Sequence, residues 1–297
     1  MLLFGQYLKQ CREQIPLSQR QLVNRLNDYD DIFQSLDNTT LSRWERSINL
    51  PSLIKQTRLT AFIAEQYQRL FPFIAEQPYH EIAKLLHSQF FCCSNHQSQL
   101  VVKCPIDQID HRDFIIHPIN SSAHQTAAIN HNLHIYSQIH RRQLSLQQHQ
   151  QLSQLAANTF LVCDYYDQYL GHLFLLKLTQ QSYQQIINFE RPESSLNKAD
   201  IAPAEEPGYY YIFGLFSLGI AVASLLICHL YALLIKNQFS IKGIGWLTHG
   251  HEQRDWAVQM GMQPALKSST RNQGLVYQAD LQTVLCSERL MKLLFKR

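Results

Sequence analysis

The sequence predicts a two-domain protein in which an all-α domain is followed by an α/β domain with a mixed sheet and flanking helices. The chain has 297 residues, about twice the roughly 150 residues of an average domain. Apolar residues recur at helical spacing through residues 1–73, whereas apolar runs of strand length follow residue 159. Hydrophobic residues make up 45% of the chain and charged residues 16%, which excludes a disordered chain and a coiled coil.

The charge and the cysteine content narrow the class of protein further. The formal net charge is only +3, so a strongly basic nucleic-acid-binding coat is excluded and any DNA contact must come from a local patch. The seven cysteines have no regular spacing, which does not suit a disulfide framework and suits the reducing cytosol. Residues 1–6 carry no basic n-region, and we therefore expect a cytoplasmic protein without a secretory signal.

Four helices are predicted within residues 1–73. The first has an apolar stripe of Phe4, Tyr7, Leu8 and Cys11. Ser18 is the expected cap of the second helix, and Asp37 or Asn38 is the expected cap of the third. A fourth amphipathic helix is expected over residues 53–70. These elements predict a compact helical unit with its own apolar core.

Three segments of this region have a combined spacing that is typical of one family. They are Leu17-Ser18-Gln19-Arg20-Gln21-Leu22, Thr40-Leu41-Ser42-Arg43-Trp44-Glu45-Arg46 and Pro51-Ser52. The pattern resembles the XRE family of helix-turn-helix proteins, the type of Cro and the phage repressors. The resemblance implies a four-to-five-helix DNA-binding domain in a sequence-specific transcriptional regulator of bacterial or phage type. Its partners would be double-stranded DNA and a second copy of the chain.

The resemblance also assigns residues to the DNA interface. The expected DNA contacts are Gln19, Asn38, Thr39, Ser42, Arg43 and Arg46. Short polar side chains at the start of a helix, with a long donor further along, are what the major groove admits. By the resemblance, Gln19 reaches a phosphate and Arg12 forms a structural salt bridge with Glu45. The connection over residues 27–36 is longer than the usual turn and holds three aspartates, so it must point away from DNA.

Residues 208–235 contain no charged residue and allow two interpretations. The stretch is long enough for one membrane span, which would make the protein a membrane-anchored regulator. Against this, residues 209–213 favour a strand, and His229 would lie at a cost inside the hydrocarbon. We therefore expect a buried strand over residues 209–217 followed by a buried helix over 220–237, and we expect no membrane partner.

The order of elements after residue 105 resembles a second family. The expected elements are a helix over 147–157, a hairpin across 160–178, a strand over 209–217, a helix over 220–237, a strand over 241–247 and a helix over 253–260. This order resembles the GNAT acetyltransferase superfamily over residues 105–285, and residues 252–262 are similar to the last helix of that family. The resemblance implies a GNAT-like mixed sheet.

The GNAT resemblance further implies a site for acetyl-CoA or another acyl-CoA. In that family, backbone N–H groups at a helix N-terminus hold the pyrophosphate of the cofactor. The matching loop here consists of Ser217, Leu218, Gly219, Ile220 and Ala221. Phe216 stands where the family has Gln or Arg, and Ala257 stands where it has a Tyr that acts as general acid. His249, His251 and Tyr211 are the substitutes that lie near this loop, and no catalytic residue is assigned.

These patterns together predict a transcriptional regulator whose GNAT-like domain is a sensor, dimerisation or partner module. One alternative is an acetyl-CoA-dependent N-acetyltransferase fused to a DNA-binding domain, and a second is the membrane-anchored regulator. The expected domains are residues 1–73 and 105–297, joined by a linker over 74–104. No metal site is expected, because Cys92, Cys93, His96 and Cys104 lack the spacing of a zinc knuckle.

Overall fold

The chain divides into two compact units. The computed structural model describes residues 3–94, 113–121, 125–140, 145–265 and 274–295. The first unit comprises Met1–His96, Tyr231–Gln238 and Gln282–Arg297, and the second comprises Gln97–Leu230 and Phe239–Leu281. The sequence had assigned all of residues 105–297 to the second domain, so the C-terminal boundary differs from the prediction. The region of Cys92 to Cys104 lies largely outside the described residues.

The first unit is helical, and its first four helices follow the predicted order. They are α1 (Phe4–Gln14), α2 (Gln19–Tyr29), α3 (Asn38–Glu45) and α4 (Leu53–Tyr67), followed by α5 (Pro72–Ala75) and α6 (Tyr79–Ser94). The Ser18 cap is confirmed, because its side chain accepts from the Gln21 backbone N–H at 3.2 Å. Asp37 caps α3 in the same way, accepting from the Thr40 N–H at 2.6 Å. Such caps satisfy N–H groups that the first turn of a helix leaves without partners.

The C-terminal helix α13 (Glu288–Leu294) belongs to the first unit because its apolar face is buried there. It packs against α4 and α6. Phe295, which follows it, lies with its ring centroid 5.1 Å from that of Phe4 and 5.2 Å from that of Tyr7. Phe295 therefore completes an aromatic core in the first unit, and this contact explains why the domain boundary differs from the prediction.

The second unit is built on one mixed sheet. Its strands are β1 (Ile115–Pro118), β2 (Thr159–Tyr165), β3 (Gln168–Leu178), β4 (Gly208–Ser217), β5 (Ile241–Thr248), β6 (Gln263–Pro264) and β7 (Leu275–Asp280). Among the described residues the spatial order is β1-β2-β3-β4-β5-β7-β6, and the β4–β5 pair is parallel whereas the other neighbours are antiparallel. Its helices are α7 (Gln125–His140), α8 (Leu146–Ser153), α9 (Gln180–Ile187) and α11 (His251–Gln259), together with α10 (Ile220–Lys236) as far as Leu230. The rest of α10 and nearly all of α12 (Leu281–Leu285) belong to the first unit.

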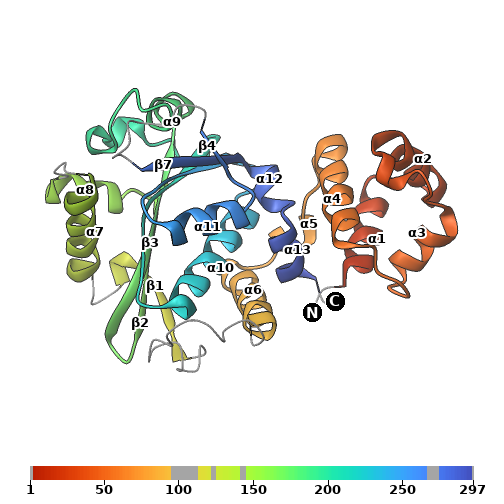
Figure 1. The fold of residues 1–297 in the computed structure, drawn as a ribbon, viewed down its shortest axis with the longest axis horizontal. Helices are drawn as coiled ribbons and strands as arrows, with labels where there is room; N and C mark the ends of the chain where they lie inside the picture. The colour runs from red at the N-terminus through yellow and green to blue at the C-terminus, as the bar shows by residue number, and fades with distance from the viewer. Residues whose placement is uncertain (1–2, 95–112, 122–124, 141–144, 266–273, 296–297) are drawn as a thin grey trace. The chain divides into compact units, whose positions relative to one another are not determined.

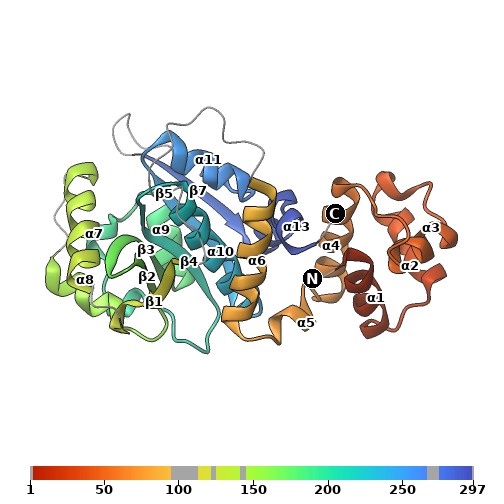
Figure 2. The ribbon, with the colours of Figure 1, turned by 90° about the horizontal axis from the view of Figure 1, so that it is seen from below.

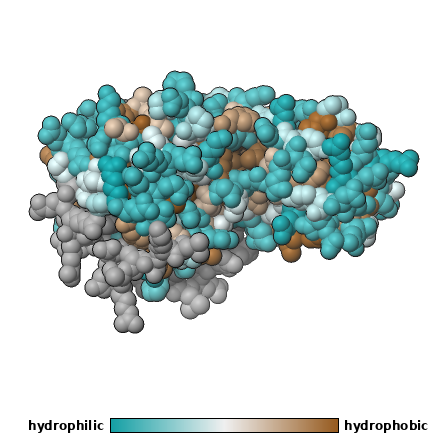
Figure 3. Space-filling model, turned by 90° about the horizontal axis from the view of Figure 1, so that it is seen from above, coloured by the Kyte–Doolittle hydropathy of each residue, from teal (hydrophilic) through white to brown (hydrophobic). Residues whose placement is uncertain are grey.

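Helices cover both faces of this sheet. Figures 1 and 2 show α7 and α8 on one face and α10 and α11 on the other. The face of α7, α8 and α9 holds a large apolar cluster in which the rings of Phe160 and Phe174 stack at 4.4 Å. The surface seen in Figure 3 is mostly hydrophilic, with apolar residues in separate patches. The apolar side chains of the sheet are therefore sequestered between the sheet and its helices.

The predicted fold class is confirmed. The second unit is an α/β unit with a mixed sheet and flanking helices, and the hairpin expected across residues 160–178 is the β2–β3 pair. The uncharged residues 208–235 form strand β4 and most of helix α10, as the buried-strand interpretation predicted. Within the described part of the chain, no helix has the length and apolar character that crossing a bilayer requires.

The close approach of α1 to α3 gives a stability prediction. A Cβ added at Gly5 would lie 2.0 Å from the backbone oxygen of Trp44, so Gly5→Ala forces the two helices apart. Over-packing of this kind costs about 1–3 kcal/mol. Urea unfolding followed by circular dichroism should show this loss, whereas Gln10→Ala on the exposed face of α1 should stay within about 0.5 kcal/mol of the wild type. Equal stability of the two variants would show that the helices do not approach as described.

Candidate functional site

Strands β4 and β5 run parallel but stay paired over only part of their length. Their register ends at Ile212↔Trp246, while β4 continues to Ser217 and β5 to Thr248. Two parallel strands that stop pairing must diverge, so the second half of β4 has β3 on one edge and no β5 partner on the other. Residues 214–217 are partly exposed, in contrast to the mostly buried first half of β4. An open strand edge is thus available at this point of the sheet.

A β-bulge lies where the divergence begins. The register with β3 shifts between Ile212 and Gly214, so Phe213 is the additional residue. Phe213 belongs to the apolar cluster on the α7 face. A Cβ on Gly214 would come within 2.4 Å of the Asn132 side chain on α7. The bulge therefore turns two consecutive residues toward the same face, as bulges near functional sites do.

The predicted acyl-CoA loop forms the turn from β4 into α10. Gly219 has φ +103°, a conformation that glycine adopts without steric cost. The Leu218 N–H donates to the Leu170 backbone oxygen at 2.8 Å, which ties the turn to β3. Leu218 and Ile220 are exposed, and Ala221 is buried. The turn thus presents the N-terminal end of a long helix, where backbone dipoles favour an anion.

A second bulge arranges polar side chains on the same face. Asp164 pairs with Tyr169 and the preceding β2 residue, Cys163, pairs with Gly171, so Leu170 is the additional residue in β3. As a result, Tyr169 and His172 lie on one face although they are three residues apart. The Tyr169 hydroxyl lies 2.5 Å from His172 Nδ1, and His172 Nε2 lies 3.3 Å from Asn132 Oδ1.

The chain of contacts continues from Asn132 into the interior. Asn132 Nδ2 lies 2.8 Å from His149 Nε2. His172 and His149 are both fully buried. Burial lowers the pKa of His172 to about 3, with the neighbouring His149 and His131 acting in the same direction, and burial lowers the pKa of His149 to about 4. Both imidazoles are therefore neutral at neutral pH, and burial raises the pKa of the Tyr169 phenol.

His131 is the exposed imidazole of this cluster. It lies one residue before Asn132 on α7. Its ring centroid is 4.3 Å from that of Phe216 and 5.7 Å from that of Tyr169. Phe216 stands in the exposed half of β4, where the GNAT resemblance predicts Gln or Arg. An aromatic–imidazole pair thus occupies a place where the family has a polar side chain.

Sequence reasoning missed this cluster. It assigned no role to His131, Asn132, His149, Tyr169 and His172. Strict alternation along β3 would place Tyr169 and His172 on opposite faces, and only the bulge at Leu170 places them on the same face. The pairing of Asn132 with Gly214 links residues far apart in the chain, for which local periodicity gives no signal.

The substitutes named from the sequence lie in different environments. Tyr211 is fully buried, and its hydroxyl group donates a hydrogen bond to the Glu193 carboxylate. His249 follows β5, and burial lowers its pKa to about 4. His251 is the exposed first residue of α11, and Ala257 is fully buried in the same helix. The structure does not bring these residues together into one hydrogen-bonded set.

The residues expected to contact DNA lie on α2, α3 and the end of α3. The side-chain amide of Gln19 donates to Glu45 Oε2 at 2.8 Å, so it is engaged within the domain rather than held out toward a phosphate. Glu45 also receives Arg12, whose Nη2 lies 3.0 Å from Oε2. The Arg46 Nε donates to the Ser42 backbone oxygen at 3.2 Å. Exposed on α3 are Asn38, Thr39 and Arg43.

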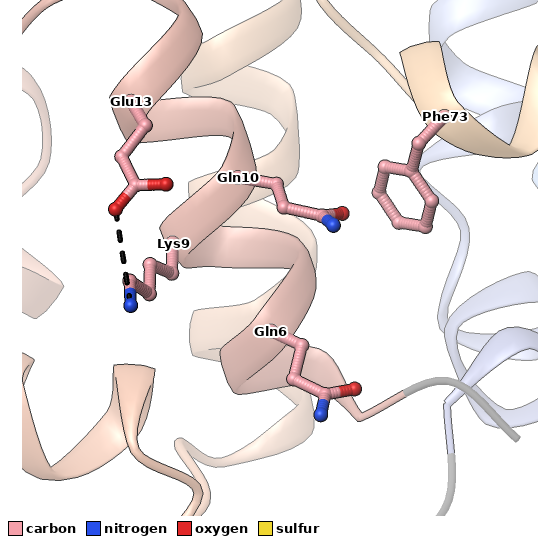
Figure 4. A pocket seen from close by; sticks show the side chains of 5 residues that line it. All are labelled: Gln6, Lys9, Gln10, Glu13 and Phe73. Carbon is pink, nitrogen blue, oxygen red and sulfur yellow. Dashed lines mark ion pairs between the residues drawn. The ribbon is translucent and has the colours of Figure 1, made fainter.

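A shallow hollow on the first unit is lined by residues that form no hydrogen-bonded cluster like the one around Asn132 among the interactions described. Figure 4 shows Gln6, Lys9, Gln10 and Glu13 along one side of α1, with Phe73 facing them. Lys9 and Glu13 form an exposed ion pair with 3.9 Å between Nζ and Oε1, and such pairs contribute little. Within the described ranges, no three His, Cys, Asp or Glu side chains are close enough to hold a metal ion.

Comparisons with known proteins relate the chain to acetyltransferases through solved structures. No protein-family model matches the sequence, and no curated protein does. A structure of Arabidopsis thaliana NAA60 in complex with a bisubstrate analogue is 10% identical, with a TM-score of 0.37 over 56% of this chain and 97% of that chain. An acetyltransferase of the GNAT family from Staphylococcus aureus Mu50 is 10% identical, with a TM-score of 0.37 over 57% of this chain and 99% of that chain.

These matches correct the predicted function. The sequence analysis predicted a DNA-binding transcriptional regulator of XRE type, and that prediction is wrong, since none of the comparisons gives evidence for an XRE domain. No comparison tests the individual residues assigned to that interface, which are Gln19, Asn38, Thr39, Ser42, Arg43 and Arg46. The GNAT-like part of the prediction and its acyl-CoA alternative agree with the matches better.

The two buried imidazoles predict a pH dependence of stability. Their pKa values of about 3 and about 4 lie below the value of about 6.5 in an unfolded chain. The unfolded state therefore binds more protons below about pH 6.5, and stability falls as the pH drops toward about 4. Between about pH 7.5 and about pH 5.5, each histidine should remove about 1.4 kcal/mol of unfolding free energy.

Urea unfolding at the two pH values measures this loss. In His149→Gln the difference between the two pH values should be smaller than in the wild type by about 1.4 kcal/mol. His80→Gln is the matched control, because the His80 side chain is 73% exposed. If His149→Gln keeps the full pH difference of the wild type, His149 is not held neutral in the folded protein.

Proposed function

We propose that the second unit binds an acyl-CoA and transfers its acyl group to an amine, as a GNAT-type N-acyltransferase. The observation that carries this proposal is the divergence of β4 from β5 after Ile212↔Trp246, next to a bulge and a glycine turn. An acyl-CoA is a long molecule with an anionic pyrophosphate and a neutral amide-containing arm that ends in a thioester. The glycine turn at the start of α10 suits the pyrophosphate, and the open edge of β4 suits the amide-containing arm.

The residues that would hold the anionic part lie in the turn into α10. Backbone N–H groups of the first turn project from the helix end, and Gly219 at φ +103° allows the backbone itself to approach a ligand. Leu218 and Ile220, 41% and 51% exposed, flank the turn with apolar surface. No side chain on this turn carries charge, so backbone dipoles would supply the attraction for the pyrophosphate.

The residues that would hold the arm lie along the open edge of β4. Amide groups of an extended ligand can pair with an unpaired strand edge, as peptides do in β-augmentation. Residues 214–217 have this edge free of β5 and are partly exposed. When bound, the cofactor would supply an acyl group activated as a thioester. The bulge at Phe213 marks where the open edge meets the buried core.

A calorimetric titration with acetyl-CoA tests the binding half of the proposal. The wild type should bind, and Gly219→Val should weaken binding at least about tenfold, because a β-branched residue at positive φ distorts the turn. Gly250→Ala is the control, since Gly250 caps another helix of the same unit and a Cβ there meets nothing within 4 Å. Wild-type affinity in Gly219→Val would show that the turn does not hold the ligand.

A thiol-release assay tests the transfer half. The full chain with acetyl-CoA should release CoA in the presence of at least one member of a panel of peptides and polyamines, and the acylated amine should be detected by mass spectrometry. Gly219→Val should lose this release in proportion to its loss of binding. Binding without release across the panel would contradict an enzymatic role and leave a ligand-binding module.

A further inference from the structure

Three imidazoles surround Asn132 and Phe216 on the α7 side of the sheet, and they differ in their access to solvent. His172 and His149 are fully buried, whereas His131 is exposed. The burial that lowers the pKa of His172 to about 3 and of His149 to about 4 keeps both neutral at neutral pH. A buried, neutral imidazole with a very low pKa takes up a proton poorly and cannot reach a molecule in solvent. His131 is the exposed imidazole of this set, so its ring is open to a molecule in solvent.

The other face of the sheet is closed to an incoming amine near this point. A Cβ added at Gly171 on β3 would lie 3.1 Å from Val222 on α10, so α10 packs directly against that face. His251 belongs to α11, on the α10 side of the sheet (Figures 1 and 2). A ligand held by the start of α10 also occupies that side. We therefore assign the α7 side, which His131 borders, to the acyl acceptor.

We propose that His131 accepts the proton that the acceptor amine loses during acyl transfer. This inference rests on the proposed function and names a residue that carries part of its chemistry. An imidazole is the side chain whose ordinary pKa lies close to neutral pH, as a general base requires. His131 lies on α7 and contacts Phe216, which belongs to the exposed half of β4.

The step balances without any further reactant. The amine nitrogen forms a bond to the carbonyl carbon, and the carbon–sulfur bond breaks with its electron pair left on sulfur. His131 takes the proton that the nitrogen gives up and returns it through solvent to the sulfur, which leaves as the CoA thiol. One proton leaves nitrogen and one arrives at sulfur, so the site returns to its starting state.

Phe216 gives the protonated imidazole a favourable neighbour. The two ring centroids are 4.3 Å apart, within the range of about 6 Å over which a cation is attracted to an aromatic face. The titratable groups near His131 are His172 and Tyr169 on β3 and His134 on its own helix, with Asp164 and His117 further along the same face. Phe216 thus supports a cationic imidazole without itself titrating.

The residue after His131 fixes the position of the helix. Asn132 contacts both buried histidines, and its carboxamide fills the space that a Gly214 side chain would occupy. Asn132 is 4% exposed. A helix residue held on three sides leaves its neighbour little freedom to shift along the strand. Asn132 is therefore a positioning residue, and His131 is the group that meets the acceptor.

The experiment is acyl transfer by the full chain with the acceptor found in the thiol-release assay. In His131→Ala we expect kcat to fall by about 10²–10⁴-fold, the range for loss of a general base, with acetyl-CoA affinity unchanged in calorimetry. The acidic limb of the pH–rate profile should disappear. Free imidazole in the buffer should restore part of the lost rate, which a merely structural defect does not permit. His134→Ala, on an exposed residue of the same helix, is the matched control.

A spectroscopic measurement adds a readout that does not depend on turnover. With isotope-labelled histidine, the ring signal that is absent from His131→Ala reports the titration of His131. Adding CoA should shift that titration, because the proposed path of the cofactor arm follows residues 214–217, and His131 contacts Phe216 within this segment. A wild type that transfers acyl groups while His131→Ala matches His134→Ala would overturn the role of His131 alone. A wild type that neither binds acetyl-CoA nor releases CoA would overturn the proposed function and this inference with it.

Discussion

The divergence of two parallel strands is the constraint on which the rest of the second unit depends. A parallel pair requires a crossover, and here α10 supplies it between β4 and β5. Ile212 is the last residue of β4 that pairs with β5, and the bulge at Phe213 follows it directly. Because a bulge bends its strand and increases its twist, we attribute the divergence to that one additional residue. The same bend sets the direction in which the chain enters the turn at Gly219.

The polar chain on the α7 face depends on the same local geometry. Asn132 connects His172 to His149, and a side chain at residue 214 would displace it. In the arrangement described, Tyr169 donates to His172, His172 to Asn132, and Asn132 to His149. His149 Nδ1 is then the buried end of the chain, with no hydrogen-bond partner among the described residues. A buried polar atom without a hydrogen-bond partner destabilises the folded state by about 1–3 kcal/mol. The rings of Phe160, Phe174 and Phe213 surround His149 in this core.

Much of the fold could be predicted from the sequence, because it depends on local signals. Ser18 and Asp37 cap their helices through side chains that the sequence alone identifies. A strand followed by a helix was predicted correctly for the uncharged residues 208–235, because tyrosines with an aromatic neighbour favour a strand. The C-terminal boundary could not be predicted, because Phe295 meets Phe4 and Tyr7 only in three dimensions.

The candidate site was predictable only in part, for a similar reason. Gly219 was singled out because the GNAT resemblance implies a loop at residues 217–221, and its positive φ agrees with a turn at that place. The cluster of His131, Asn132 and His172 was not identified, because two bulges change which residues share a face. The predicted DNA-binding function was wrong. It rested on a helical pattern that contains Ser-Gln and Arg-Trp-Glu, and not on the order of the strands. Capped helices share such patterns across unrelated folds, whereas a parallel pair with its crossover is more restrictive.

Two departures from the GNAT pattern become consistent with each other once the cluster is known. Phe216 removes a polar side chain from the exposed half of β4, and Ala257 removes a hydroxyl from α11, on the α10 side of the sheet. Polar groups are instead concentrated on the opposite face, on β3 and α7, where Tyr169, His172 and His131 surround Phe216. The aromatic ring at residue 216 fits that surrounding, since an imidazole and a phenol can pack on it. Phe216 and the polar groups around it therefore share the α7 face, whereas Ala257 is buried in α11 on the other side of the sheet.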